Sequence, residues 1–488
     1  MDPFERRRAG ILLHPTSLPG SVGNGELGIE AYRFVDFLAD CNVGLWQMLP
    51  LGPTHSDLSP YQCFSVHAGN TRLISLQRLV EAGWLDDASL DPRQDIAVQR
   101  KARLIAAHNG FQRHADDELR SGLEAFIEQH ANWLDNFALY QALRDEFNGL
   151  AWFDWPGPLR NRDPAALEEA RRRLASAIEQ VQFEQFLFFR QWLDLRHYAN
   201  EHGVLLFGDI PIFVAYDSAE VWASRQWFEL DEQGGLKVVA GVPPDYFSET
   251  GQRWGNPHYD WKALADDGYR WWLERIHTQL ELFDLMRIDH FRGFEAYWEI
   301  NAASDTAIDG RWVAGPGADF FEALRREFGK LPLVAEDLGV ITPEVTALRR
   351  QFELPGMKIL QFAFDGSSDN PYLPHNHEPL SVVYTGTHDN NTTLGWYEEL
   401  SGEQRDFIHR YLGLEGDSMP WPLVRTALAS VARLAVLPMQ DVLALDASHR
   451  MNIPGIAEGN WQWRFEWEQL QPEYGERLKD WVQLYGRA

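Results

Sequence analysis

Short apolar runs that end abruptly in charged residues recur along the chain. The clearest covers residues 282–288 and is followed directly by Asp289. Its apolar members are Leu282, Phe283, Leu285, Met286 and Ile288. A run of this length is too short for a helix of its own and is typical of a buried parallel strand whose carboxyl end opens into a site. Because an unpaired buried carboxylate is unfavourable, we expect Asp289 to pair with Arg287, to be exposed in a cleft, or both.

Seven further segments have the pattern of buried strands. They lie at residues 10–15, 45–51, 204–211, 333–337, 357–362, 382–385 and 435–438. Helical or inserted segments separate them, such as residues 30–38 and 269–283, whose apolar positions recur with a helical period. This alternation predicts an α/β fold, a (β/α)8 barrel. A doubly wound open sheet is the alternative, and we disfavour it because no Gly-x-Gly-x-x-Gly segment follows the first strand.

Two long segments interrupt the alternation of strands and helices. Residues 72–201 are mostly helical in pattern and strongly charged, and a helix is predicted to begin at Asp163-Pro164, since Asp is a favourable N-cap and Pro suits the first helical position. Apolar residues then recur every seven positions, at Leu167, Leu174, Val181, Phe188 and Leu195. Residues 217–262 are instead rich in Trp, Gly and Pro. We therefore expect one catalytic barrel over residues 1–488 with a helical insertion at 72–201 and an aromatic, cleft-lining insertion at 217–262.

Composition restricts the partners and the compartment. The 488 residues carry a formal net charge of -28, which disfavours nucleic acid and anionic membrane surfaces as partners. The two cysteines, Cys41 and Cys63, are too few for a disulfide scaffold and fit a reducing compartment. The apolar stretch that follows Arg6-Arg7-Arg8 stops at His14-Pro15, far short of a signal peptide, and no stretch approaches the length of a membrane span. We expect a cytoplasmic protein.

Carboxylates follow or end several of the predicted strands. In a (β/α)8 barrel the carboxyl ends of all strands face one side, so we expect Asp209, Asp289, Glu336 and Asp389 to surround one mouth. A single carboxylate after a strand is often only a helix N-cap, but four of them together favour a site. Arg287 precedes Asp289 by two positions and therefore shares its strand face, where it can keep that carboxylate ionised and oriented.

Two chemistries use carboxylates at the mouth of a barrel. A metal-dependent hydrolase would use His and Asp as ligands, but no His-x-His pair ends a strand, and His290 and His388 each adjoin an Asp, so that alternation points the two side chains apart. Glycoside chemistry with retention needs two carboxyl groups about 5–5.5 Å apart. It also needs aromatic surfaces for sugar faces, which the segment 217–262 supplies. We therefore favour glycoside chemistry without a metal.

Ten motifs extend these single residues to almost the whole chain. They lie at residues 14–20, 46–53, 59–62, 208–214, 241–248, 253–257, 287–293, 335–339, 387–390 and 458–461. In these motifs and in their order the chain resembles the 4-α-glucanotransferases, also called amylomaltases or disproportionating enzymes, which form glycoside hydrolase family 77 of the α-amylase clan. Any one motif is weak evidence, but the set is very specific. One departure is Glu26 in Gly23-Asn-Gly-Glu-Leu-Gly28, where the family pattern has Asp before Leu, a conservative change in a loop.

The resemblance implies a role for each residue of the mouth. Asp289 would be the nucleophile that forms a β-glucosyl-enzyme, and Glu336 the general acid/base. Asp389 would stabilise the transition state by holding sugar hydroxyls, with help from His388 and Arg287. Further residues would bind substrate: Tyr61, Asp209, His290 and Asn460 in the donor site, Trp254, Tyr246 and Phe247 over the cleft, and Asp365 near the end of the strand at 357–362.

The implied reaction is transfer of α-1,4-glucan segments from a donor maltodextrin to the 4-hydroxyl of an acceptor glucan or glucose. It would proceed by a retaining double displacement and require no cofactor. The aromatic residues over the cleft would exclude water and stack an acceptor sugar. An α-glucan hydrolase of the same clan is the alternative. A glucan-binding protein without activity would have lost one of the three carboxylates Asp289, Glu336 and Asp389, and all are present.

Overall fold

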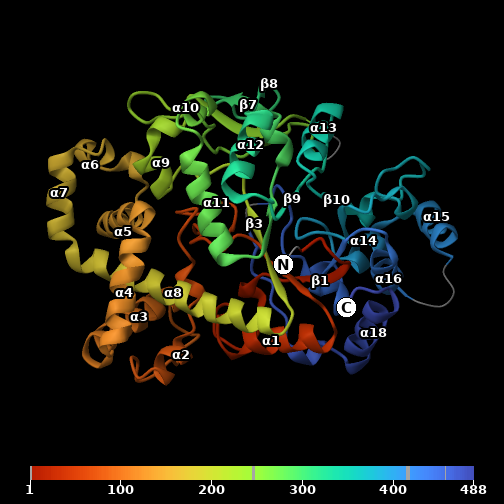
Figure 1. The fold of residues 1–488 in the computed structure, drawn as a ribbon, viewed down its shortest axis with the longest axis horizontal. Helices are drawn as coiled ribbons and strands as arrows, with labels where there is room; N and C mark the ends of the chain where they lie inside the picture. Colours follow the sequence, from red (N-terminus) through yellow and green to blue (C-terminus); the bar gives the residue numbers. More distant parts are fainter. Residues whose placement is uncertain (1–2, 245–247, 414–417, 457) are drawn as a thin grey trace.

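Eight parallel strands form the centre of the molecule (Figure 1). The structure is a computed structural model and describes residues 3–244, 248–413, 418–456 and 458–488. In chain order the strands are β1 (Arg8–Leu12), β2 (Leu45–Gln47), β3 (Leu205–Ile210), β6 (Leu285–Ile288), β9 (Leu333–Ala335), β10 (Gly356–Ile359), β11 (Ser381–Tyr384) and β12 (Leu434–Pro438). All eight correspond to strands predicted from the sequence.

Strand pairing closes these strands into a barrel. Consecutive strands pair in parallel from β1 to β9 and from β10 to β12, and β12 pairs with β1. The backbone N–H of Ala335 donates to the carbonyl oxygen of Pro355 at 2.8 Å, which joins β9 to the residue before β10. The predicted (β/α)8 barrel is therefore confirmed.

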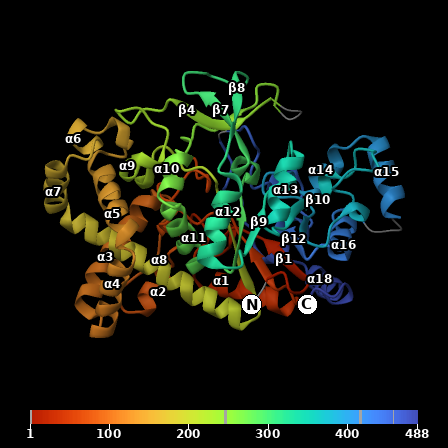
Figure 2. The ribbon, with the colours of Figure 1, turned by 45° about the horizontal axis from the view of Figure 1, so that its top comes forward.

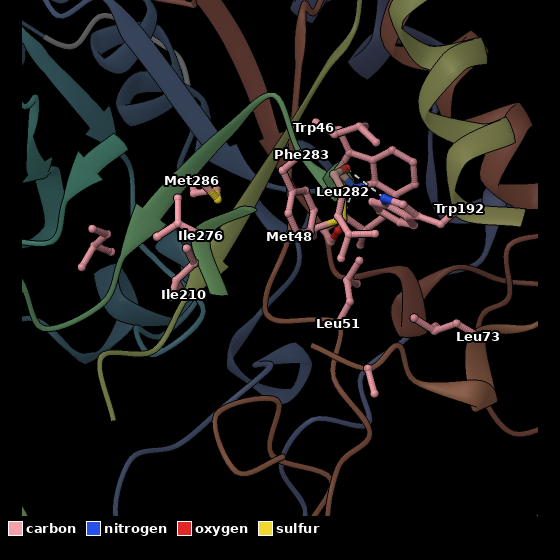
Figure 3. Packing of buried hydrophobic residues seen from close by; sticks show 14 of the residues in the cluster. Trp46, Met48, Leu51, Leu73, Trp192, Ile210, Ile276, Leu282, Phe283 and Met286 are labelled. Carbon is pink, nitrogen blue, oxygen red and sulfur yellow. Dashed lines mark hydrogen bonds between the residues drawn. The ribbon is translucent and has the colours of Figure 1, made fainter. Parts of the chain in front are cut away.

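Side chains fill the barrel from the inside and cover it from the outside. One buried cluster takes members from all eight strands and occupies the interior; among them are Leu12, Leu45, Phe207, Leu285, Val334, Ile359, Tyr384 and Val436. Alternate strand residues point outward. There Ile210 and Met286 lie beside the helix residue Ile276, and elsewhere in the same cluster the Nε1 of Trp192 donates to the carbonyl oxygen of Leu282 at 2.8 Å (Figure 3).

Helices enclose the strands on the outside (Figures 1 and 2). Those near the barrel include α1 (Ile29–Asp40), α11 (Arg270–Leu282), α12 (Gly317–Phe328), α13 (Pro343–Gln351), α14 (Thr393–Glu399), α15 (Gly402–Leu412), α16 (Trp421–Ala429), α17 (Met439–Val442) and α18 (Pro472–Leu484). Helix α11 can lie close to β3 because Gly208 has no side chain: a Cβ there would be 2.3 Å from the ring of Phe283, the residue after α11.

The segment 72–201 is largely helical. It contains α2 (Leu76–Glu81), α3 (Ile96–His114), α4 (Asp117–Gln129), α5 (Ala131–Glu146), α6 (Gly157–Arg160), α7 (Pro164–Arg173) and α8 (Ala175–Glu201). Asp163 caps α7 by accepting from the N–H of Ala166, as the sequence predicts. The apolar stripe does not lie on one helix, however, because the chain turns at Leu174 between α7 and α8 (Figure 1). The later part of α8 packs on the barrel through Trp192.

A second, antiparallel sheet lies beside the barrel. Its strands are β4 (Val238–Val242), β5 (Gln252–Arg253), β7 (Ala296–Asn301) and β8 (Gly310–Ala314), in the order β5-β4-β7-β8. Two short helices, α9 (Ala219–Ala223) and α10 (Trp261–Asp266), flank the first two strands in sequence. The sequence did not predict this sheet. Across the described ranges, no helix combines the length and the apolar character needed to span a membrane.

Candidate active site

The four strand-end carboxylates lie at one end of the barrel. Asp209 is in β3, Asp289 follows β6 directly, Glu336 follows β9 directly, and Asp389 lies in the loop after β11. The pairing of β3, β6 and β9 continues past the strand ends, since the N–H of Asp289 donates to the carbonyl oxygen of Ile210 and the N–H of Glu336 to that of Ile288, each at 3.0 Å. Three of the carboxylates are therefore fixed by one continuous set of backbone hydrogen bonds.

Arg287 is the ion-pair partner of two of these carboxylates. It lies directly opposite Asp209 in the register of β3 and β6. Its Nη1 binds Asp209 Oδ2 at 2.5 Å, and its Nη2 binds Asp289 Oδ1 at 2.7 Å. Although burial disfavours its charge, Asp209 and Asp289 hold the pKa of the Arg287 guanidinium well above its ordinary value. The interaction expected between Arg287 and Asp289 is therefore present.

Tyr61 joins this ion pair to the loop after β11. Its hydroxyl donates to Asp209 Oδ2 at 2.7 Å and lies 3.0 Å from Nε2 of His388. Because a tyrosine hydroxyl has one proton, the Nε2–H of His388 must donate to the Tyr61 oxygen. Burial lowers the pKa of His388, against the effect of Asp389, so the ring is neutral. The two rings stack with centroids 5.3 Å apart.

Glu336 is buried and held by two backbone amides. Its Oε2 accepts from the N–H of His290 at 2.7 Å, and its Oε1 from the N–H of Leu338 at 2.9 Å. Burial raises the pKa of Glu336 to about 7; Asp289 acts in the same direction, whereas Arg287 and the two amides oppose it. At neutral pH this carboxyl group therefore retains a proton for part of the time, unlike an ordinary surface glutamate.

His290 contributes through its backbone as well as its ring. Its φ of 51° lies in the left-handed region, which is uncommon for a residue with a side chain and directs its N–H toward Glu336. Burial lowers the pKa of the imidazole to about 3, so the ring is neutral. The ring of Trp254 packs edge-on against it, with centroids 4.9 Å apart.

Asp389 is the most exposed of the three proposed catalytic carboxylates. Its side chain is 47% exposed, compared with 28% for Asp289, and Glu336 is buried. Asn452 Nδ2 donates to its Oδ1 at 2.6 Å, and Arg450 Nη2 donates to its backbone carbonyl oxygen at 2.9 Å. Asp389 is thus positioned by the segment after β12 while part of its carboxylate faces solvent.

A buried carboxylate fixes both ends of the Asp389 loop. Asp441, in α17, accepts from the hydroxyls of Thr385 and Thr393 and from the N–H of Thr393. Thr385 follows β11, and Thr393 begins α14. The loop between them therefore has defined ends, which restricts where Asp389 can lie.

The other residues expected to bind substrate have different surroundings. The Asn460 side chain bonds the backbone of Ile453 and Ile456, so it shapes its own loop. Asp365 is exposed and accepts from the N–H of Ser367 in a turn, and within the described ranges no hydrogen bond or ion pair joins it to the four carboxylates. Tyr246 and Phe247 lie outside the described residues.

Three residues near the carboxylates were not singled out from the sequence. Arg450 and Asn452 bind Asp389 from the segment after β12. The Trp461 ring lies 6.0 Å from the rings of both Tyr61 and His388. Trp461 lies in one of the ten motifs, which was the only available signal for it. Arg450 and Asn452 carry no such signal.

The geometry is suited to acid–base and nucleophilic chemistry. One carboxylate is ion-paired and partly exposed, one carboxyl is buried with a raised pKa, and one is about half exposed. Carboxyl groups with such different environments can act as nucleophile, acid and hydroxyl-binding group in one site. Among the residues that the structure describes, no group of three or more His, Cys, Asp or Glu is arranged to hold a metal ion.

Comparison with known proteins identifies relatives over nearly the full length. Residues 13–470 match the protein family described as 4-alpha-glucanotransferase. The 4-alpha-glucanotransferase of Thermus thermophilus is 52% identical over 487 residues, which cover 97% of each protein. That of Synechocystis sp. is 46% identical over 498 residues, 99% of each. The structure of amylomaltase from Streptococcus agalactiae in complex with acarbose matches with a TM-score of 0.95 and 37% identity, over 99% of this chain and 100% of that one.

Proposed function

This chain belongs to the 4-alpha-glucanotransferase family, and we propose that it transfers α-1,4-glucan segments to acceptor glucans or glucose through a covalent intermediate on Asp289. The observation that carries the assignment of the site is the contrast between neighbouring carboxyl groups. Asp289 is ion-paired to Arg287, whereas burial raises the pKa of Glu336 to about 7. A retaining glycoside mechanism requires one group of each kind.

Asp289 acts as the nucleophile. Arg287 Nη2 binds its Oδ1, which leaves Oδ2 to attack the anomeric carbon of the donor. The Arg287 guanidinium is itself fixed by Asp209 on the neighbouring strand, so the attacking carboxylate has a defined orientation. Attack forms a β-glucosyl ester and releases the reducing-end part of the donor, with inversion at the anomeric carbon.

Glu336 acts as the acid and then as the base. It donates its proton to the glycosidic oxygen as the bond to the anomeric carbon breaks. It then accepts the proton of the acceptor 4-hydroxyl as that oxygen attacks the ester, a second inversion that regenerates the α-linkage. We expect its carboxyl group to lie about 5–5.5 Å from that of Asp289, as retention requires.

Asp389 and His388 hold sugar hydroxyls. The exposed part of the Asp389 carboxylate accepts hydrogen bonds from a glucosyl unit whose ring flattens in the transition state. The Streptococcus agalactiae amylomaltase binds acarbose, which supports α-glucans as ligands here. No cofactor takes part in these steps. Trp254, from the segment 217–262, forms part of the wall beside His290 and helps to exclude water from the ester.

The products from maltotriose test transfer directly. A transferase converts maltotriose into glucose and a series of longer maltodextrins, because a sugar hydroxyl takes the place of water in the second step. We expect this series from the purified protein by chromatography, with the total number of glycosidic bonds conserved. A product mixture of only shorter sugars, with a rise in reducing ends, would instead show an α-glucan hydrolase.

The pH dependence of kcat/KM reports the protonation of Glu336. A general acid works only while it carries its proton, and the pKa of Glu336 is raised from 4.5 to about 7. We therefore expect kcat/KM to fall as the pH rises through about 7, approaching a tenfold loss per pH unit above it. Initial rates from pH 5 to 9 measure this limb.

Asp209 is the control for this pH profile. Burial also raises the pKa of Asp209, although Arg287 and Tyr61 oppose this effect. If Glu336 is responsible, Asp209→Asn lowers the rate but keeps an alkaline limb. An alkaline limb already at pH 4–5, as for an exposed glutamate, would contradict the role given to Glu336.

A further inference from the structure

Trp312 is an exposed tryptophan with one face already covered. It lies on β8, the edge strand of the small antiparallel sheet, at the top of the molecule in Figure 2. The guanidinium of Arg292 stacks 3.8 Å from the centre of its ring. Trp312 nevertheless remains 42% exposed. Because Arg292 covers one face of the ring and the residue remains exposed, Trp312 offers a flat apolar surface on which a ligand could stack.

The ring is restrained on two sides. Trp298, directly opposite in the pairing of β7 and β8, packs against it at 67° with centroids 5.2 Å apart. Trp298 is itself fixed, because its Nε1 donates to the carbonyl oxygen of Ala307 at 2.9 Å. A rigid aromatic surface binds a ligand at little cost in conformational entropy. The position of the Trp312 ring is therefore fixed in the protein without a ligand.

Arg292 also binds the segment that follows Glu336 in the chain. Its Nη1 donates to the carbonyl oxygen of Val340, which is 61% exposed and lies four residues after Glu336. Arg292 itself lies two residues after His290, whose N–H binds Glu336. Arg292 therefore joins Trp312 to the chain segment that follows Glu336, and Arg292 itself belongs to the segment that follows His290.

We propose that Trp312 and Val340 form a second glucan-binding surface outside the catalytic cleft, which holds a distant part of a long α-1,4-glucan chain. This inference rests on the proposed function, because a long glucan must be the substrate. The apolar face of a glucosyl ring stacks on the open face of Trp312 while Arg292 supports the opposite face. Binding there raises the concentration of chain ends and segments near the cleft.

The chemistry of the surface favours an uncharged carbohydrate. The two cations beside the Trp312 ring are already engaged, since Arg292 is buried beneath the ring and Arg311 is ion-paired with Glu299 at 2.6 Å. The formal net charge of -28 repels polyanions. A protein partner would need a larger apolar area than one tryptophan and one valine provide. A neutral polysaccharide can bind by stacking one of its glucosyl rings on Trp312, and every glucosyl unit along its length offers such a ring.

The test compares long and short substrates. We expect Trp312→Ala to lower kcat/KM for amylose about three- to tenfold more than kcat/KM for maltotriose, because the proposed surface helps only chains long enough to occupy it and the cleft together. Trp312→Phe keeps an aromatic ring, so its kcat/KM for amylose should lie between the values for the wild-type protein and for Trp312→Ala. Binding of soluble amylose to each protein, measured by retardation in a native gel, should weaken in the same order.

Two controls separate the possible failures. Trp467 also lies under an arginine, with Arg33 4.2 Å from its ring, but on the side of α1, so Trp467→Ala should change the rates on both substrates equally. If Trp312→Ala leaves the ratio of the two rates and the amylose retardation unchanged, the second surface does not exist. If wild-type protein makes no longer maltodextrins from maltotriose, the proposed function itself fails.

Discussion

Asp289→Asn is expected to lower kcat for glucan transfer by about 10³–10⁵-fold. The amide is a poor nucleophile and cannot form the glucosyl ester, so both halves of the reaction are lost. The asparagine oxygen still accepts a hydrogen bond from Arg287, and the side chain is about the same size, so the fold should be preserved. The measurement is the initial rate of glucose release from maltotriose.

The matched control for Asp289→Asn is the same substitution at a capping position. Asp163 caps α7, and asparagine is an equally good N-cap, so Asp163→Asn should keep both the activity and the midpoint of thermal unfolding. Transfer at the wild-type rate by Asp289→Asn would overturn the assignment of the nucleophile. Loss of activity together with a large fall in the unfolding midpoint would instead show that Asp289 serves mainly to balance the charge of Arg287.

The barrel strands were predictable because they are buried on both faces. Residues such as Phe207 and Met286 face the interior or the helices, and almost every position is apolar until the strand ends. The carboxylates at the ends of those strands were predictable for the same reason, since charged residues are few in the strands and most of them lie near the carboxyl ends. Parallel topology then requires that these strand ends meet.

The small sheet was not predictable from local pattern. Strand β7 pairs with β4, which lies more than fifty residues earlier in the chain, and its residues Tyr297, Trp298, Glu299 and Ile300 mix aromatic, acidic and aliphatic side chains without a clear polar face. The hydrogen-bond partners of Asp389 were likewise not predictable from local pattern. Asn452 and Arg450 lie in an irregular segment whose path depends on contacts such as that of Asn460 with Ile453.

The protonation of Glu336, its orientation and the break in the apolar stripe could not be predicted from residue types alone. The protonation of Glu336 follows from its burial, and its orientation follows from the left-handed backbone of His290. The turn at Leu174 divides an apolar stripe that looks continuous in the sequence. Burial and backbone conformation are properties of the folded chain, so the sequence indicated the participants but not their arrangement.

Glu336→Gln should separate the two steps of the reaction. Glutamine cannot donate a proton to the glycosidic oxygen, so we expect transfer from maltodextrins to fall by about 10²–10⁴-fold. A donor with fluoride as its leaving group, such as α-maltosyl fluoride, needs no acid. With this donor the first step should remain fast, and fluoride release should show a burst equal to the enzyme concentration, because the second step lacks its base.

The intermediate provides the decisive readout for Glu336→Gln. Mass spectrometry of the protein during the burst should show one added maltosyl group, attached to Asp289. Azide attacks such an ester without a base, so added azide should restore turnover and give an α-glycosyl azide. Asp289→Asn, in contrast, should show neither the burst nor the rescue. If Glu336→Gln were as slow with the fluoride as with maltodextrin, Glu336 would not be the group that protonates the leaving oxygen.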